Sequence, residues 1–180
     1  MIALNRRSIL AALATVAAAP SAAFASRGRD KKGTSSQAAQ SAQYVEFIQV
    51  LKEKRRMDLI ADGKIVKSYK IRLGKQLKGH KRFQGDGRTP EGTYFISGRN
   101  PRSAFHLSLR ISYPNRSDLA YASRRGKSPG GDIFIHGQPN GFKRGTIAVD
   151  WTRGCIAVSN KEMEEIYSLI PNGCPIHIHA

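Results

Sequence analysis

Alternating apolar and polar residues predict β-strands along most of the chain from residue 44 to its end. The expected strands cover residues 44–51, 56–60, 65–73, 93–97, 105–111, 133–136, 156–158 and 175–179. Between the second and third of these strands lies Asp62-Gly63, a sequence typical of a tight hairpin turn. Hairpins of this kind bury one face and leave the other polar, which suits the lysines and arginines at the outer positions. The pattern therefore predicts a mostly β domain.

One segment near the C-terminus changes to the period of an α-helix. Ser159 and Glu162 have the spacing of a capping box, in which each side chain bonds the other residue's backbone N–H where a helix begins. A Pro-Asn-Gly sequence at residues 171–173 ends the segment. Its apolar residues recur at helical spacing: Met163, Ile166, Tyr167 and Ile170. We expect one amphipathic helix before the last strand.

Two stretches are predicted to lie outside regular structure. Residues 85–94, GDGRTPEGTY, contain Pro90 and Gly92, which favour a rigid turn with a structural role ahead of a strand. Residues 112–131 form a long loop. Its basic cluster consists of Arg124, Arg125 and Lys127. A loop of this length in a compact domain is usually functional or mobile, and a plain surface insertion is the alternative.

The first 25 residues are typical of a signal peptide. Arg6 and Arg7 give it a basic start, residues 9–19 are apolar, and Ala23-Phe24-Ala25 is a small-x-small cleavage site. The sequence around the two arginines also resembles a twin-arginine signal, so both the Sec and the twin-arginine route stay open. We expect export to the periplasm or cell wall, with cleavage after Ala25.

The predicted organisation is a signal peptide at 1–25, a flexible basic linker at 26–43 and one folded domain at 44–180. The linker residues are small, polar and basic and carry no periodic apolar face. The apolar run within the signal is too short to span a bilayer comfortably, so no stable membrane insertion is expected after cleavage.

The chain is strongly basic, with a net charge of +17 and a pI near 10.4. Such a charge suggests a polyanionic partner, which could be nucleic acid, acidic lipid or an acidic cell-wall polymer. No zinc finger, RNP pattern or basic helix is present, so nucleic acid is not expected. His177 and His179 alternate along the last predicted strand without a third ligand at suitable spacing, so no metal is expected either.

A histidine and a cysteine at the ends of two predicted strands form the candidate catalytic pair. His136 ends the strand at 133–136, and Cys155 comes directly before the strand at 156–158. A base beside a thiol can generate the thiolate that acts as a nucleophile. Each residue has a plainer alternative, because a lone cysteine is more often a small buried side chain and a lone histidine a core or surface residue. The second cysteine, Cys174, could form a disulfide with the first in an oxidising compartment, but that would consume the nucleophile, so we expect two free thiols.

The residues around this pair resemble the signature of the L,D-transpeptidase catalytic domain, also called the YkuD domain. The matching elements are Ile135-His136-Gly137 and Thr152-Arg153-Gly154-Cys155-Ile156, with 15 residues between His136 and Thr152. The stretch at residues 85–94 also closely resembles a hallmark of this family. Arg153 departs from the pattern, because most members have a second histidine at that position. The resemblance covers roughly residues 44–180 and implies a mostly β, sandwich or barrel-like domain with one or two short helices.

The resemblance implies acyl transfer on peptidoglycan stem peptides without a cofactor. Cys155 would attack the carbonyl of diaminopimelate at its L-centre, and His136 would accept the thiol proton and later protonate the leaving amine. Backbone N–H groups of Gly154 and Cys155 would hold the oxyanion. The thioester would then be resolved by an amine of a second stem, giving a 3→3 cross-link, or by water.

Two alternatives stay open from the sequence. The first is a carboxypeptidase or endopeptidase of the same fold, which would hydrolyse stem peptides, cross-links or a wall-attached lipoprotein. The second is a wall-binding module that performs no chemistry. Gly137, Thr152 and Arg153 are expected to contact substrate. For Arg153 we favour binding of a substrate carboxylate; stabilisation of the thiolate and a solvent-facing side chain without a role are the alternatives.

Overall fold

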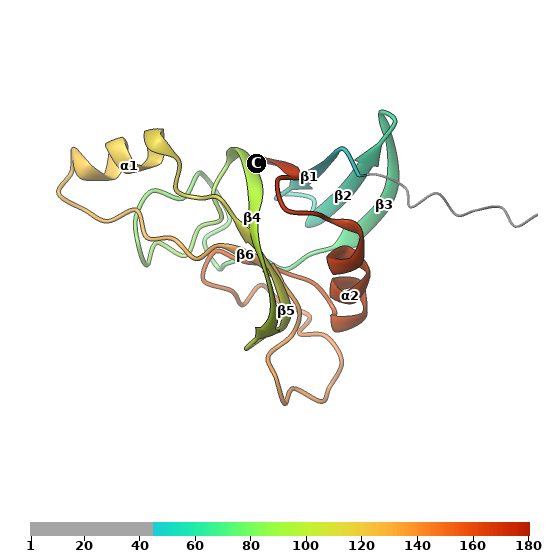
Figure 1. Ribbon diagram of the computed structural model, residues 1–180. Coiled ribbons are helices and arrows are strands. Elements are labelled where there is room, and N and C mark those ends of the chain that lie inside the picture. Colours follow the sequence, from blue (N-terminus) through green and yellow to red (C-terminus); the bar gives the residue numbers. More distant parts are fainter. Residues whose placement is uncertain (1–44) are drawn as a thin grey trace, which may run out of the picture. The chain divides into compact units, whose positions relative to one another are not determined.

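The computed structural model describes residues 45–180 (Figure 1). The predicted signal peptide and linker lie outside the described residues. Within the described range the chain forms eight strands and two helices, in the order β1 Phe47–Leu51, β2 Arg56–Ala61, β3 Lys64–Lys70, β4 Gly92–Ser103, β5 His106–Ile111, α1 Arg116–Ser123, β6 Phe134–His136, β7 Ile156–Ala157, α2 Asn160–Leu169 and β8 Pro175–His179. No helix in this range is long and apolar enough to cross a membrane. The mostly β domain with short helices is confirmed.

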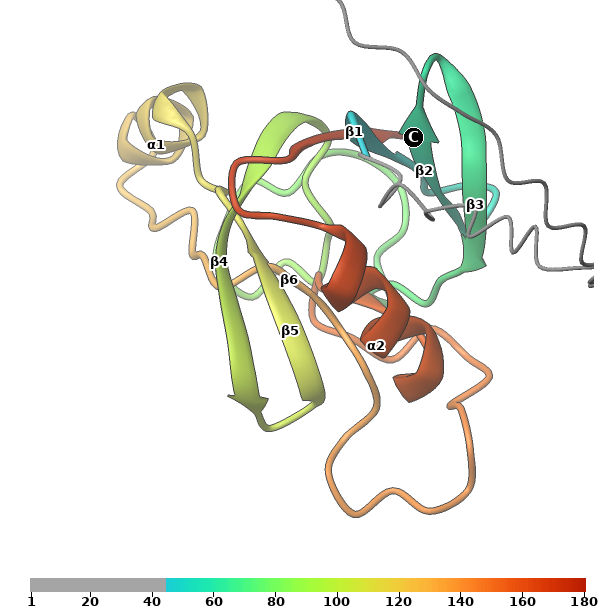
Figure 2. The ribbon, with the colours of Figure 1, turned by 45° about the vertical axis from the view of Figure 1, so that its right-hand side comes forward.

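The eight strands form one mixed sheet in the order β3-β2-β1-β8-β4-β5-β6-β7. The β1–β8 and β6–β7 pairs are parallel and the others antiparallel. Figure 2 shows β1, β2 and β3 on one side of the domain and β4 and β5 on the other. The chain just after β3 pairs with β7, because the backbones of Arg72 and Ala157 exchange two N–H···O bonds of 2.8 Å. This contact joins the two ends of the strand order and gives the sheet its barrel-like closure.

The predicted hairpin at Asp62-Gly63 is present between β2 and β3. Both residues have positive φ, 51° and 66°, as a type I′ turn requires, and Ala61 pairs with Lys64 across it. The apolar face of this hairpin packs into a single core with the other strands and α2. Fully buried members of that core include Leu59, Ile96, Leu109, Ile135, Ile156, Met163 and Ile176. Each such side chain contributes about 1.5–3 kcal/mol relative to remaining exposed.

Helix α2 begins where its sequence predicts. The Ser159 Oγ atom accepts the Glu162 N–H at 3.2 Å, and the Glu162 carboxylate accepts the Ser159 N–H at 2.8 Å, so the capping box is complete. Met163 and Ile166 are buried against the sheet. The cap comes two residues after β7, so it holds the end of the strand that follows Cys155.

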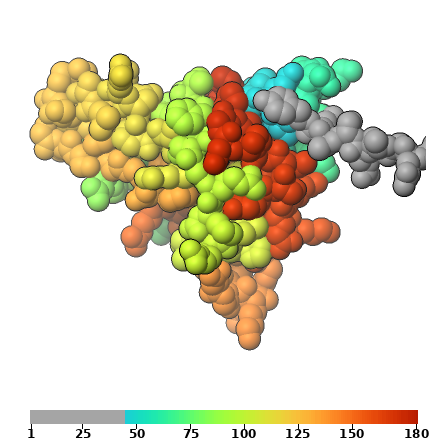
Figure 3. All heavy atoms as spheres, viewed as in Figure 1, coloured from blue at the N-terminus to red at the C-terminus, as the bar shows by residue number. Residues whose placement is uncertain are grey.

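The stretch at residues 112–131, predicted to be a loop, contains helix α1, and that prediction was wrong. Asn115 caps the helix, because its side chain accepts the N–H groups of Ser117 and Asp118. Only Asp118 and Ala122 are buried within the helix. A helix this short with no apolar stripe leaves no periodic signal in the sequence. Figure 3 shows this segment, in yellow, projecting at one edge of the described domain.

Strand β4 extends six residues beyond the predicted end at residue 97. Its first part pairs with β8 and its second part with β5, with two register shifts along the second pairing. The predicted strand at 65–73 is shorter, since β3 ends at Lys70. The turn before β4 is rigid, because the carboxylate of Asp86 accepts three backbone N–H groups and the Lys81 ammonium.

Candidate active site

Strands β6 and β7 bring the predicted nucleophile and base together. They are parallel neighbours, with Ile135 opposite Ile156 and His136 opposite Ala157. Cys155 therefore lies level with Phe134, and alternation along each strand places the side chains of Cys155 and His136 on the same face of the sheet. Both side chains line the same two cavities. Strand pairing thus brings these two side chains, which are 19 positions apart in the sequence, to one site.

His136 is held as a neutral base. Its side chain is buried, and its Nδ1 atom lies 2.7 Å from the carbonyl oxygen of Gly137, so Nδ1 carries the hydrogen and donates it. This leaves the lone pair of Nε2 for a proton. The ring lies 4.6 Å from the ring of Phe105 and edge-on to Trp151 at 5.6 Å, centroid to centroid. Burial among these groups lowers the pKa of His136 below its usual 6.5.

Cys155 is half-buried and stays protonated in the resting site. Burial raises the pKa of its thiol above the usual 9.0, and a backbone hydrogen bond from Phe134 only partly opposes this rise. The Sγ atom lies 3.5 Å from the carbonyl oxygen of Asp132, to which the thiol donates. Because burial disfavours both the thiolate and the imidazolium, the resting pair is a neutral thiol and a neutral imidazole.

The turn before Cys155 is fixed by Thr152 and Gly154. The Thr152 hydroxyl donates to the Cys155 carbonyl at 2.7 Å and accepts the Gly154 N–H at 3.2 Å. Gly154 has φ of +121°, and a Cβ atom there would lie 2.5 Å from the carbonyl oxygen of Arg88. Only glycine fits this close approach. The Gly154 N–H is thus already bonded within the turn, and the oxyanion role expected of the Gly154 and Cys155 amides stays a prediction.

Gly137 orients His136 through a backbone hydrogen bond. Its N–H donates to the carbonyl oxygen of Phe105 at 3.0 Å, and its own carbonyl accepts the His136 hydrogen. A Cβ atom at this position would lie 2.5 Å from the Oδ1 atom of Asn160. Gly137 lines neither cavity at the catalytic pair. Its geometry therefore orients the base, and the substrate contact expected of it stays a prediction.

Two cavities meet at the candidate catalytic pair, Cys155 and His136. The larger, of about 570 Å³, is lined by Phe105, His136, Trp151, Thr152, Arg153 and Cys155. The smaller, of about 240 Å³, shares Phe105, His136 and Cys155 with it and extends to Asn100, Ser103, Ser108, Asp132 and Phe134. Arg153 is exposed at the larger cavity, and its side chain forms no hydrogen bond or ion pair among residues 45–180. Its guanidinium is therefore available to an anionic group of a bound substrate.

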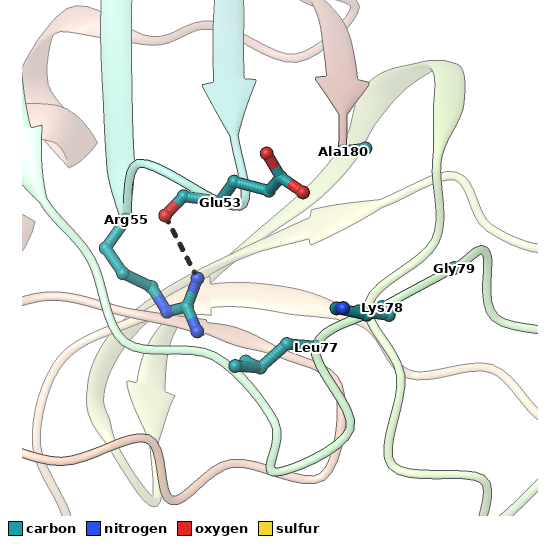
Figure 4. Close-up of a pocket in the computed structure, with 6 residues that line it drawn as sticks. All are labelled: Glu53, Arg55, Leu77, Lys78, Gly79 and Ala180. Carbon is teal, nitrogen blue, oxygen red and sulfur yellow. Dashed lines mark hydrogen bonds between the residues drawn. The ribbon is translucent and has the colours of Figure 1, made fainter.

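A third cavity, of about 510 Å³, lies elsewhere and is lined by Glu53, Arg55, Leu77, Lys78, Gly79 and Ala180 (Figure 4). It contains neither a cysteine nor a histidine, so it lacks a nucleophile and base of the kind found at the first site. Arg55 forms an ion pair of 2.9 Å with Asp150, whose carboxylate also accepts the Leu73 N–H. This cavity wall thus anchors the segment that leads into Thr152.

Three residues of the site carry little signal in the sequence. The sequence pattern predicts only an apolar strand residue at Phe105, yet its ring packs against the ring of His136. Asp132 acts through its backbone carbonyl, which any residue type would supply. Gln138 is fully buried and joins two segments, because its side chain donates to the Val158 carbonyl at 2.6 Å and accepts the Ile147 N–H at 2.9 Å. These three residues are recognised as part of the site only from their contacts in the fold. Their spacing along the chain does not predict them.

The family model of the L,D-transpeptidase catalytic domain (YkuD) matches residues 46–178. The chain therefore belongs to the L,D-transpeptidase catalytic domain family. The match covers every strand and helix described above except the last residue of β8.

Individual relatives agree with this assignment. YafK of Escherichia coli (strain K12), a protein assigned to the L,D-transpeptidases, is 28% identical over 130 residues, which are 69% of this chain and 46% of YafK. The structure of the helical cell shape determining protein Pgp2 from Campylobacter jejuni is 29% identical, with a TM-score of 0.60 over 75% of this chain and 47% of Pgp2. An L,D-transpeptidase from Mycobacterium smegmatis shares the fold, with a TM-score of 0.51 at 15% identity over 76% of this chain and 59% of that one. The chain spans about half the length of YafK and Pgp2.

Proposed function

We propose that this protein is a cysteine-dependent L,D-transpeptidase that forms 3→3 cross-links between peptidoglycan stem peptides. The observation that carries the proposal is the parallel pairing of β6 with β7, which places Cys155 and His136 on one face where two cavities meet. Acyl transfer between two peptides needs a nucleophile, a base and room for a donor and an acceptor. Membership of the family supports the choice of peptidoglycan peptides as substrates.

The first half-reaction transfers the acyl group to sulfur. The Nε2 atom of His136 accepts the thiol hydrogen of Cys155 while Sγ bonds to the carbonyl carbon at the L-centre of diaminopimelate. The carbonyl oxygen becomes an oxyanion held by the Cys155 N–H. The C–N bond to the terminal D-residue then breaks, and the imidazolium returns its proton to the departing amine. The product is a thioester and a free D-amino acid.

The second half-reaction releases the thioester to an amine. His136, neutral again, accepts a proton from the amine of a second stem as that nitrogen attacks the thioester carbonyl. Collapse breaks the C–S bond, and the proton on His136 restores the Cys155 thiol. The same base serves both steps, because Arg153 stays protonated and cannot accept a proton.

Hydrolysis by the same thioester is the second candidate function. Water in place of the acceptor amine would make the enzyme a carboxypeptidase or an endopeptidase acting on stems, cross-links or a wall-attached lipoprotein. Pgp2, which is more similar in sequence than the Mycobacterium smegmatis enzyme, is named for cell shape rather than for cross-linking. Hydrolysis stays the second candidate because both reactions share the acylation of Cys155 and differ only in what resolves the thioester.

Mass spectrometry of purified tetrapeptide muropeptides incubated with the protein tests the proposal. A cross-linked dimer that appears only with an acceptor stem supports the transpeptidase, whereas a shortened monomer with or without an acceptor supports the hydrolase. A carbapenem should label Cys155, because it acylates a catalytic thiol. A protein that forms neither product nor adduct would be a wall-binding module.

The proposal places the protein outside the cytoplasm, in the periplasm or cell wall, where its substrate lies. The support is the signal-like sequence at residues 1–25, with cleavage proposed after Ala25. The N-terminus of the exported protein, read by mass spectrometry, should be Ser26. An intact Met1 on a membrane-bound protein would contradict this localisation.

A further inference from the structure

A group of cations on and beside α1 is not used by the catalytic site. It consists of Arg82, Arg124, Arg125 and Lys127, which we call the α1 cationic surface. Arg124, Arg125 and Lys127 are exposed and Arg82 is half-buried. The group comes from two segments of the chain, which a backbone bond of 2.9 Å from the Gln84 N–H to the Ser128 carbonyl holds together. Figure 3 shows the yellow and orange segment that carries most of this surface projecting from the domain.

Aromatic rings hold three of these cations in place. The guanidinium carbons of Arg82 and Arg125 lie 4.3 Å and 3.7 Å from the ring centroid of Tyr121. The Lys127 ammonium lies 4.8 Å from the ring centroid of Phe83, and this ring packs against Tyr121 at 5.9 Å. Stacking restricts the arginine side chains, and one N–H group of Arg125 also donates to the Tyr121 carbonyl at 3.2 Å. The cations are thus organised before any ligand arrives.

No acid neutralises this surface among residues 45–180. The four side chains take part in none of the ion pairs of the described domain. The two nearby carboxylates are occupied internally. Asp86 bonds Lys81 and three backbone N–H groups, and the buried Asp118 bonds His80, Tyr94 and the helix cap. The surface therefore keeps an uncompensated positive charge.

The chain leads directly from this surface to the catalytic cysteine. Lys127 is five residues before Asp132, which lines the smaller cavity and whose carbonyl oxygen accepts the Cys155 thiol hydrogen. On the other segment, the carbonyl of Arg88 contacts Gly154. A short stretch of chain therefore joins the α1 cationic surface to the smaller cavity.

We propose that the α1 cationic surface is a second binding surface for peptidoglycan, which engages carboxylates of stem peptides next to the stem in the active site. The inference rests on the proposed function, because it takes the substrate polymer as the partner. Stem peptides repeat along a glycan strand, so a wall fragment offers several carboxylates at once. Arginine suits them, because its planar fork donates two N–H groups to one carboxylate. Binding at this surface raises the occupancy of the active site by polymeric substrate, although the surface does not contact the reacting atoms.

Binding of the Cys155→Ala protein to purified sacculi tests this surface without turnover. Arg125→Glu/Lys127→Glu in that background should weaken binding about tenfold at low salt, because two attractions become repulsions. The difference should vanish at about 1 M salt, where the screening length falls to about 3 Å. Amidation of the wall carboxylates should weaken binding of the unsubstituted surface to the same extent.

The matched control is Lys64→Glu/Lys70→Glu, which makes the same change of charge at two exposed lysines of β3. Equal weakening by this control would overturn the proposal, since net charge alone would then explain binding. Tighter binding to anionic lipid vesicles than to sacculi would overturn it too, because the partner would be a membrane.

A separate assay keeps this proposal distinct from the proposed function. With Cys155 intact, Arg125→Glu/Lys127→Glu should leave turnover of a soluble tetrapeptide muropeptide unchanged and reduce turnover of sacculi. Loss of both activities with normal folding would show that the surface belongs to the catalytic machinery and contradict the inference. If the unsubstituted protein turns over no muropeptide, the proposed function fails, and the sacculus binding still decides on the surface.

Discussion

The Nδ1 atom of His136 donates its hydrogen to the carbonyl oxygen of Gly137 at 2.7 Å. This one bond sets the tautomer of the ring and leaves the lone pair of Nε2 free to accept a proton. It is made between neighbours in the chain, but it is directed by the packing of Gly137 against Phe105 and Asn160. Cys155 is likewise positioned by its neighbours, because Thr152 and Gly154 form the hydrogen bonds of the turn that precedes it.

The first prediction concerns the two cysteines. Cys155→Ala should lower turnover at least about 10³-fold, because the nucleophile is removed, and His136→Ala should be similarly severe because the base is removed. The free energy of unfolding of Cys155→Ala should stay within about 1–2 kcal/mol of the unsubstituted protein. Cys174→Ala is the control and should keep most activity. Turnover of a tetrapeptide substrate and thermal unfolding measure both effects. Activity in Cys155→Ala with none in Cys174→Ala would reverse the assignment.

The second prediction concerns pH. Burial lowers the pKa of His136 below 6.5 and raises that of the Cys155 thiol above 9.0, so the neutral pair persists between these two values. Asp132 and Lys81 also act on the thiol, in opposite directions. Activity should hold below pH 6.5 until His136 is protonated. The midpoint of the rise in Cys155 alkylation by iodoacetamide with pH should lie above 9.0, because burial disfavours the thiolate. An alkylation midpoint near neutral pH would instead show a preformed thiolate–imidazolium pair.

The third prediction uses two glycines with positive φ. Gly154→Ala should destabilise the protein by more than the ~1–2 kcal/mol of backbone strain and reduce activity about a hundredfold, because its Cβ would meet the Arg88 carbonyl and shift Cys155. Gly141→Ala should cost only the backbone strain, since nothing lies within 4 Å of its Cβ. Urea unfolding and steady-state kinetics measure the two effects. Equal results for both variants would show that the contact with Arg88 has no influence on the site.

The fourth prediction concerns Arg153. If its guanidinium binds a substrate carboxylate, Arg153→Ala should raise KM about tenfold or more, the value of one charge-assisted hydrogen bond, and leave the pH profile of Cys155 alkylation in place. Arg144→Ala, which removes another exposed charge from the loop before Asp150, should change neither. Steady-state kinetics on a stem tetrapeptide are the measurement. A shift of the alkylation profile to higher pH with KM unchanged would mean that Arg153 stabilises the thiolate.

Several elements of this protein follow from short-range patterns in the sequence. The turn at Asp62-Gly63, the cap of α2 at Ser159 and strand β8 all lie where local spacing predicts them. The turn and the cap are each set within a few residues, by positive φ angles or a side-chain to backbone bond, whereas β8 is predicted by its alternating apolar residues. The hydrophobic period likewise predicts which faces are buried, and the spacing of His136 and Cys155 identifies the candidate pair.

Helix α1 and the pairing of distant strands are seen only in the tertiary structure, because short-range sequence patterns do not predict them. Helix α1 buries only Asp118 and Ala122, so its apolar period is absent, although Asn115 and Asp118 hold the spacing of a capping box. The pairing of β6 with β7 and of Arg72 with Ala157 joins residues far apart in the chain. Such long-range pairs depend on how the whole core packs, so no window of sequence reports them. The same packing buries His136 and Cys155 together, and this burial makes their resting pair neutral.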